Sequence, residues 1–238
     1  PYLAAQYGGG IFLLVYLILA VTFGFALLTA EIAIGRKTKL SPVLAYKKLN
    51  KKFSFLGYIA TLVPIIIIPY YCVIGGWVTK YVTVYAQGLV APAAKDGYFS
   101  DFIGHPIAPL VFFLIFMLIS IVVIMLGVKK GIEKLSKFLM PLLVVLTIGI
   151  AIYALTLPNA MEGVKYYLIP DFSKFSILTV AGAMSQLFYS MSIAMGIMVT
   201  YGSYTRDDVN LTKSVNRIEF FDTLVALLAG LTIIPAVY

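Results

Sequence analysis

Long apolar runs constrain this chain more than any other feature. Five runs, at about residues 11–35, 56–87, 107–128, 138–157 and 177–204, carry few charges, and a sixth begins near residue 219. A bilayer core about 30 Å thick needs roughly 20 apolar residues per helix. Hydrophobic residues make up 61% of the chain and charged residues only 12%, whereas about a quarter of an average soluble domain is charged. The sequence therefore predicts an all-α membrane protein that crosses the bilayer several times.

The expected helices follow these runs, within one transmembrane domain that spans residues 1–238. We expect them at about residues 1–8, 11–35, 56–87, 107–128, 132–157, 176–204 and 214–238. Pro64 and Pro69 fall inside the longest run, where neighbouring helices can satisfy the freed carbonyl groups. The sequence begins with Pro1 and ends inside an apolar run. We therefore expect it to be an internal piece of a longer protein.

The net charge of +8 is concentrated in alternate loops. Fourteen of the 18 Lys and Arg residues lie in loops 36–55, 128–137 and 205–219. The positive-inside rule places such loops in the cytoplasm, which predicts a multi-pass protein of the cell (inner) membrane with the lipid bilayer as partner. The positive charge thus reports topology, and we do not expect nucleic acid as a partner.

A polar segment interrupts the run 177–204. Residues 185–196, SQLFYSMSIAMG, place four polar side chains and a poor helix former, Gly196, at the middle of the membrane. Polar groups at this depth are functional hypotheses by default. A broken helix here would free backbone groups that bind cations and carboxylates. The alternative is a continuous helix whose polar side chains bond to packed neighbours.

Four other residues are candidates for a functional role. Asp222 is either an acid favoured by the dipole of a helix N-terminal turn or a buried anion that needs a cation, a proton or polar partners. Tyr70 and Tyr71, halfway along the run 56–87, either pack in a core or offer a hydroxyl to a substrate carboxylate. For Glu31, at the end of the run 11–35, we expect a cap or an ion pair at the membrane interface.

Enzyme centres and bound cofactors find no support in the sequence. Cys72 and His105 are the sole residues of their types, and neither lies in a metal-ligand cluster. No serine has a histidine nearby, no phosphate-binding loop occurs, and residues 8–10, GGG, follow no strand. We therefore expect neither catalysis nor an organic cofactor.

Several long motifs resemble the neurotransmitter:sodium symporter family. They are PYLAAQYGGG (1–10), FLLVY (12–16), EIAIGR (31–36), the segment 185–204 and DTLVALLAG (222–230). The resemblance covers essentially the whole chain in the family order, from the outer half of the first helix to the seventh. It implies a bacterial amino-acid transporter with part of the LeuT-type five-plus-five inverted-repeat helical bundle, in which the sixth helix is broken.

The resemblance also implies substrate-binding positions. The hydroxyl of Tyr71 would contact the substrate carboxylate, and Tyr189 would form the aromatic lid, where Phe is usual. Met195 replaces an aromatic residue, which suggests an adaptable pocket for a bulky apolar side chain. The full set of implied positions is Ile67, Tyr71, Tyr189, Ser192, Ala194 and Met195.

Ion sites are implied in the same way. The positions that form the chloride site of animal relatives are Tyr16, Gln186, Ser190 and Asp222. Ser190 also matches a sodium ligand, and we expect Ser190 and Asp222 to serve sodium. A fixed carboxylate at Asp222 supplies the negative charge that chloride brings elsewhere, which predicts chloride-independent transport. Gly131 and Pro141 match a spacing that lets the fifth helix unwind and open a sodium site inward.

The function implied is sodium-coupled symport of an apolar or aromatic amino acid by alternating access. The core of the first helix and the eighth helix are absent from the sequence, so we expect the chain by itself not to transport. Two alternatives remain, a membrane sensor that binds sodium and amino acid without transport, and a passive channel. The particular amino acid, the sodium stoichiometry, proton antiport and the oligomeric state are left open.

Overall fold

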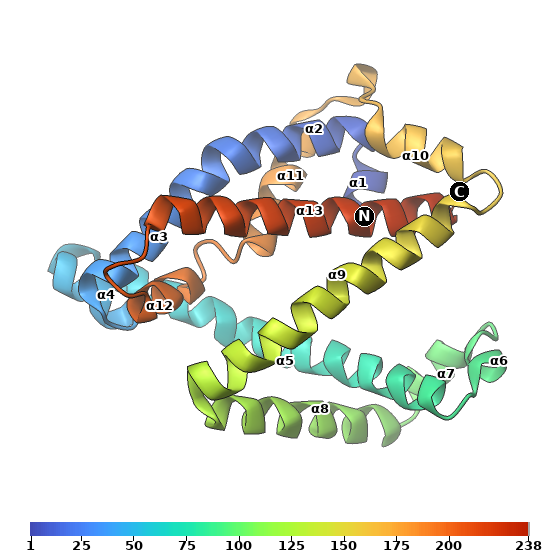
Figure 1. Cartoon of the computed structure of the whole chain (residues 1–238), viewed down its shortest axis with the longest axis horizontal. Coiled ribbons are helices and arrows are strands. Elements are labelled where there is room, and N and C mark those ends of the chain that lie inside the picture. Colours follow the sequence, from blue (N-terminus) through green and yellow to red (C-terminus); the bar gives the residue numbers. More distant parts are fainter. Residues whose placement is uncertain (238) are drawn as a thin grey trace. The chain divides into compact units, whose positions relative to one another are not determined.

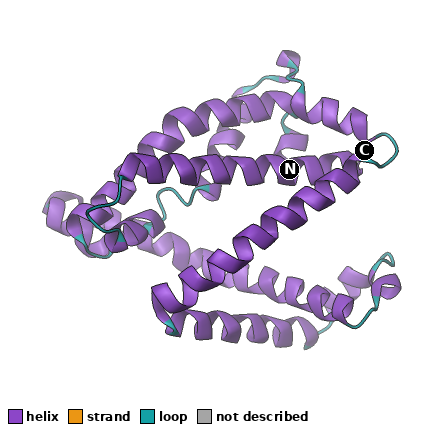
Figure 2. Cartoon of the chain, viewed as in Figure 1, coloured by secondary structure: helices purple, strands orange, loops and turns teal. Residues whose placement is uncertain are grey.

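The computed structural model describes residues 1–237, with the side chain of Lys129 excepted. Tyr238, the last residue of the final predicted helix, lies outside the described residues. Nearly all of the described chain is helical (Figure 1, Figure 2). Within it, β pairing is limited to an isolated antiparallel bridge between Gly9 and Pro170.

The helices follow one another with short connections. They are α1 (Tyr2–Gln6), α2 (Gly10–Leu19), the π-helical η1 (Ala20–Gly24), α3 (Phe25–Thr38), α4 (Pro42–Leu49), η2 (Lys51–Phe53), α5 (Ser54–Ala86), α6 (Val90–Ala93), α7 (Tyr98–Gly104), α8 (Ala108–Met125), the π-helical η3 (Val128–Glu133), α9 (Lys134–Leu155), α10 (Ala160–Leu168), η4 (Phe172–Lys174), α11 (Ile177–Ser190), α12 (Ile197–Tyr204) and α13 (Leu211–Val237).

Five described segments are long and apolar enough to cross a membrane. They are Gly10–Thr38, Lys51–Ala86, Ala108–Met125, Lys130–Leu155 and Leu211–Val237. The predicted fold class, an all-α membrane protein with a broken sixth helix, is confirmed, because α11 and α12 replace one continuous helix over 176–204.

The predicted loop boundaries were less accurate. Helix α3 continues to Thr38, α4 lies inside the loop 36–55, η3 and the start of α9 occupy 128–137, and α13 begins at Leu211 inside 205–219. Hydropathy marks the stretch that lipid can surround, whereas backbone hydrogen bonding continues into water. Arg36 and Lys37 in the last turn of α3 even favour that extension, because cations stabilise a helix C-terminus.

The chain divides into two compact units. The first contains Pro1–Leu62 and the chain from Pro141 onward, and the second contains Val63–Met140. In the second unit, Gly75 and Gly76 of α5 bring that helix close to α8, where a methyl group on Gly76 would lie 2.7 Å from the backbone nitrogen of Phe113. The ammonium of Lys80 lies 5.4 Å from the ring centre of Phe112.

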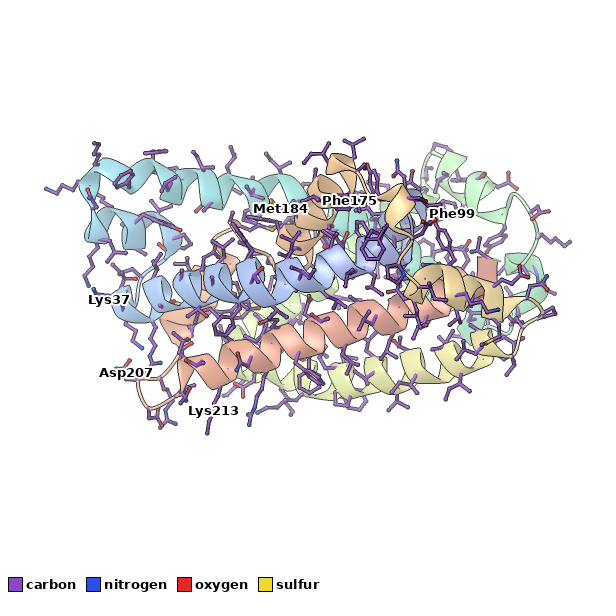
Figure 3. All side chains as sticks on the ribbon, turned by 90° about the horizontal axis from the view of Figure 1, so that it is seen from above. Lys37, Phe99, Phe175, Met184, Asp207 and Lys213 are labelled. Carbon is purple, nitrogen blue, oxygen red and sulfur yellow. The ribbon has the colours of Figure 1, made fainter. Side chains whose placement is uncertain are left out.

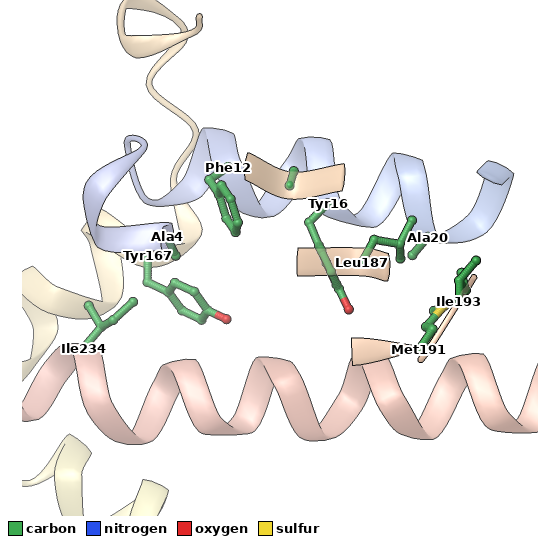
Figure 4. Packing of buried hydrophobic residues seen from close by; sticks show 10 residues of the cluster. Ala4, Phe12, Tyr16, Ala20, Tyr167, Leu187, Met191, Ile193 and Ile234 are labelled. Carbon is green, nitrogen blue, oxygen red and sulfur yellow. The ribbon is translucent and has the colours of Figure 1, made fainter. Parts of the chain in front are cut away.

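A buried cluster fills the first unit. Helix α11 packs on α2, and α10 packs on α13. Figure 4 shows the rings of Tyr16 and Tyr167 extending toward α13. Helix α1 is held against α10 as well, because the Tyr166 hydroxyl donates a hydrogen bond to the carbonyl oxygen of Ala5 at 2.7 Å. The buried members of the cluster are Ala4, Phe12, Tyr16, Ala20, Tyr167, Ala183, Leu187, Met191, Ile193 and Ile234.

Two glycines let α3 and α12 touch backbone to backbone. A methyl group on Gly35 would lie 1.9 Å from the carbonyl oxygen of Val199, and one on Gly202 would lie 2.4 Å from that of Ile32. Small residues permit this close approach between membrane helices. The short helix α12 is therefore held in place by its contact with α3.

We predict that Gly35→Ala destabilises the full-length protein by about 1–3 kcal/mol, because the added methyl group forces α3 and α12 apart. Gly149→Ala is the matched control, since nothing lies within 4 Å of a methyl group at that position in α9. Thermal unfolding in detergent measures both. Equal unfolding midpoints for the two variants would contradict the packing argument.

Candidate functional site

The backbone between α11 and α12 is irregular. Helix α11 ends at Ser190, and α12 begins at Ile197. Between them, Ser192 and Ala194 adopt positive φ values of 54° and 64°, and Gly196 follows at 68°. Such values are uncommon for residues with a side chain and mark strain that the surrounding structure must hold in place. The break lies inside the polar segment 185–196.

Glu31 holds this break. Its Oε1 atom accepts a hydrogen bond from the backbone N–H of Ala194 at 2.7 Å, and the residue is only 9% exposed. Its Oε2 atom is buried and has no hydrogen-bond partner within the described residues. The expected interfacial cap or ion pair for Glu31 was wrong. The residue faces the protein interior because Gly35, one turn later, presses the same face of α3 against α12.

Asp222 lies at the other end of the break. The Ser190 hydroxyl lies 2.9 Å from both carboxylate oxygens of Asp222, and the Tyr16 hydroxyl lies 3.4 Å from Oδ2. Helix α13 begins at Leu211, so Asp222 sits about three turns inside the helix. The interpretation of Asp222 as an acid of the N-terminal turn was therefore wrong. It is a partly buried carboxylate with polar partners from α2 and α11.

A cavity of about 260 Å³ opens beside Asp222. Burial raises the pKa of the Tyr167 phenol to about 12, so this hydroxyl stays neutral and can donate a hydrogen bond. Apolar side chains of α1, α2 and α13 complete the wall. The polar side chains that line the cavity are Tyr16, Tyr167, Gln186, Ser190 and Asp222. The four positions predicted for the ion-site region thus line one cavity.

The predicted substrate positions fall in both units. Ser192, Ala194 and Met195 lie in the break itself, and Tyr189, which is 41% exposed, lies in the last turn of α11. In the second unit, Ile67 and Tyr71 are one turn apart on α5 and so share a face of that helix.

The structure also places the other residues that the sequence singled out, Tyr70, Tyr71, Gly131 and Pro141. Tyr70 and Tyr71 are exposed within the second unit, with ring centres 5.9 Å apart in an edge-to-face arrangement. Gly131 lies in the π-helical η3, where a methyl group would meet the carbonyl oxygen of Val123 at 2.0 Å. Pro141 lies inside α9.

Two residues of the candidate site, Glu31 and Tyr167, were not predicted from the sequence. The signal for Glu31 was available, because an acid about 20 residues into an apolar run is expensive and therefore a functional candidate. No sequence signal singled out Tyr167, whose place in the cavity depends on how α10 packs on α13.

Known proteins resemble this chain along its length. A model described as the sodium:neurotransmitter symporter family matches residues 1–92 and 100–237. An uncharacterised sodium-dependent transporter of Bacillus subtilis is 35% identical over all of this chain, which covers 54% of that protein. The sodium- and chloride-dependent taurine transporter of Rattus norvegicus is 24% identical over 98% of this chain, which covers 45% of that protein.

A solved structure agrees with these matches. The crystal structure of MhsT in complex with L-phenylalanine is 38% identical in sequence and superimposes with a TM-score of 0.93. The match covers 99% of this chain and 55% of that chain. This chain therefore spans about half the length of the proteins that it matches.

We predict that Glu31→Ala loosens the break, because the backbone N–H of Ala194 loses the carboxylate that accepts its hydrogen bond. A hydrogen bond contributes about 0.5–1.5 kcal/mol net, so amide hydrogen exchange at residues 191–196 should accelerate roughly two- to tenfold. Glu31→Gln is the control, since its amide oxygen can still accept the bond. The interpretation fails if both variants exchange as slowly as the original protein.

Proposed function

The chain belongs to the sodium:neurotransmitter symporter family, and on this premise we propose that the full-length protein couples sodium entry to the uptake of an amino acid with an apolar or aromatic side chain. Family members are multi-pass membrane transporters, and the relatives found are transporters and not enzymes. The observation that carries the proposal is the break between α11 and α12. Discontinuous membrane helices are the usual site of substrate and ion binding in transporters.

The direction in which the Ser190 hydroxyl donates its proton favours a cation site beside Asp222. A hydroxyl has one proton and two acceptor lone pairs. Because Ser190 directs its proton toward the Asp222 carboxylate, its oxygen can offer a lone pair to sodium. The carboxylate adds a negative charge next to that position. Ser190 and Asp222 would thus serve sodium together, and no organic cofactor is needed.

Asp222 also supports chloride independence. Tyr16, Gln186 and Ser190 provide hydroxyl and amide donors around one negative charge. Chloride seeks the same kind of surroundings, and the carboxylate already occupies them. The taurine transporter from rat is named as sodium- and chloride-dependent, whereas the relative from Bacillus subtilis is named only as sodium-dependent.

The substrate class rests on the residues around the break. Tyr189 and Met195 offer an aromatic and a flexible apolar surface to a side chain. Ser192 and Ala194 bring exposed backbone close to the polar end of an amino acid. The family pattern adds Ile67 and the hydroxyl of Tyr71. The solved structure of MhsT, which contains L-phenylalanine, supports the same class of substrate.

Alternating access would use the start of the fifth membrane helix. Gly131 lies in a π-helical turn, and Pro141 removes a hydrogen bond inside α9. Both features weaken this segment, which favours local opening toward the inside. We propose that the basic loops 36–55, 128–137 and 205–219 face the cytoplasm. A membrane potential would then contribute about 2.3 kcal/mol per sodium charge for each 100 mV.

The proposed transport is tested in proteoliposomes that contain the full-length protein. We expect accumulation of radiolabelled phenylalanine above the external concentration when sodium is high outside, and none when potassium replaces sodium. Sodium-dependent binding without accumulation would indicate a sensor instead. Sodium currents that do not change when amino acid is added would indicate a channel. Either result would overturn the proposal.

Chloride independence is tested by replacing chloride with gluconate. We expect unchanged uptake by the original protein. Uptake by Asp222→Asn should fall roughly tenfold or more in gluconate, because a buried charge that organises its partners is lost, and chloride should partly restore it. Glu219→Gln, which removes a half-buried acid from the same helix, should remain chloride-independent. The idea is wrong if the original protein needs chloride or if Asp222→Asn transports equally in both anions.

A further inference from the structure

A basic hollow lies at one end of the first unit, away from the break. It has a volume of about 540 Å³ and lies between the C-terminal end of α3 and the loop that joins α12 to α13. Figure 3 shows Lys37, Asp207 and Lys213 at this end. The hollow is lined by Ala33, Arg36, Lys37, Lys39, Asp207 and Leu211. Three cations thus face a single carboxylate.

Two of the three cations hold the loop in place. Arg36 donates to the carbonyl oxygens of Val209 at 2.8 Å and Asp207 at 2.5 Å. Lys39 lies 3.0 Å from a carboxylate oxygen of Asp207 and also donates to the carbonyl of Thr205. The loop is therefore anchored mainly through its backbone, and its position does not depend on the Asp207 side chain alone.

The third cation, Lys37, is exposed and forms no ion pair with any residue that the structure describes. The hydrogen bond from Lys39 holds the pKa of the Asp207 carboxyl below its usual range, so Asp207 is ionised at neutral pH. The hollow then carries a net charge of +2, from three cations and one carboxylate. An anion that enters it gains a free cation at Lys37.

The hollow lies just past the apolar parts of two helices that are long enough to span a membrane. The span Gly10–Thr38 ends beside it, and the span Leu211–Val237 begins beside it. Ala33 and Leu211 provide an apolar wall on the side of the spans. The long Lys and Arg side chains of the hollow can reach toward the lipid phosphates at the boundary between hydrocarbon and water. Basic residues next to the ends of membrane helices attract anionic headgroups.

We propose that this hollow binds the phosphate group of an anionic phospholipid, with Lys37 as the principal contact and Asp207 as a competing anion within the protein. Free inorganic phosphate has the same charge chemistry. The apolar wall and the position at the ends of two spans favour the lipid, whose chains can lie along the helices. This site is separate from the proposed transport site, and its test does not depend on transport.

The experiment titrates the full-length protein, purified in a neutral detergent, with phosphatidylglycerol and counts bound lipid by native mass spectrometry. Lys37→Gln should weaken binding roughly fivefold, because a basic residue near lipid headgroups contributes about 1 kcal/mol. Asp207→Asn should strengthen binding by a similar factor, since Arg36 still anchors the loop by its backbone bonds. Lys37→Arg should bind as the original protein does.

Lys134→Gln is the matched control, because it removes one exposed cation from a different basic loop. It should leave the affinity unchanged. The proposal is overturned if Lys134→Gln weakens binding as much as Lys37→Gln, if Asp207→Asn fails to strengthen binding, or if phosphatidylcholine binds equally well. Displacement of the lipid by millimolar inorganic phosphate would also overturn it, in favour of a site for the free ion.

Discussion

The hydrogen bond from Ala194 to Glu31 is the interaction on which the rest of the site depends. A backbone N–H that leaves a helix inside a membrane must find another acceptor, and Glu31 supplies one at 2.7 Å. Its carboxylate reaches the break because Gly35 and Gly202 let α3 and α12 meet at backbone distance. Close helix packing and the strained break therefore stabilise each other.

A carboxylate fixes each end of the interrupted segment. Ser190, the last residue of α11, bonds to Asp222 on α13, and Ala194, four residues later, bonds to Glu31 on α3. The break is thus held by hydrogen bonds to α3 and α13, two helices that are distant in sequence. This arrangement keeps polar backbone accessible without letting it collapse into a helix, which is what ion and amino-acid binding by backbone groups requires.

The sequence predicted the helices because they depend on local composition, whereas composition left the break as one of two alternatives and the family resemblance favoured it. Apolar runs must become helices in a bilayer, and the polar segment 185–196 with Gly196 marks where helix is least favourable. The role of Glu31 depends instead on the register between α3 and α12, which no local pattern contains. The start of α13 was placed too late because Asn210 caps the helix in a polar stretch, where hydropathy gives no signal.

The short helix α1 is connected to α13 through α10. It is joined to the α10 region by the bond from Tyr166 to Ala5, and the glycine turn that follows it pairs with Pro170. Helix α10 in turn packs on the end of α13 opposite to Leu211. Helix α1 is therefore connected through α10 to α13, the helix that carries Asp222.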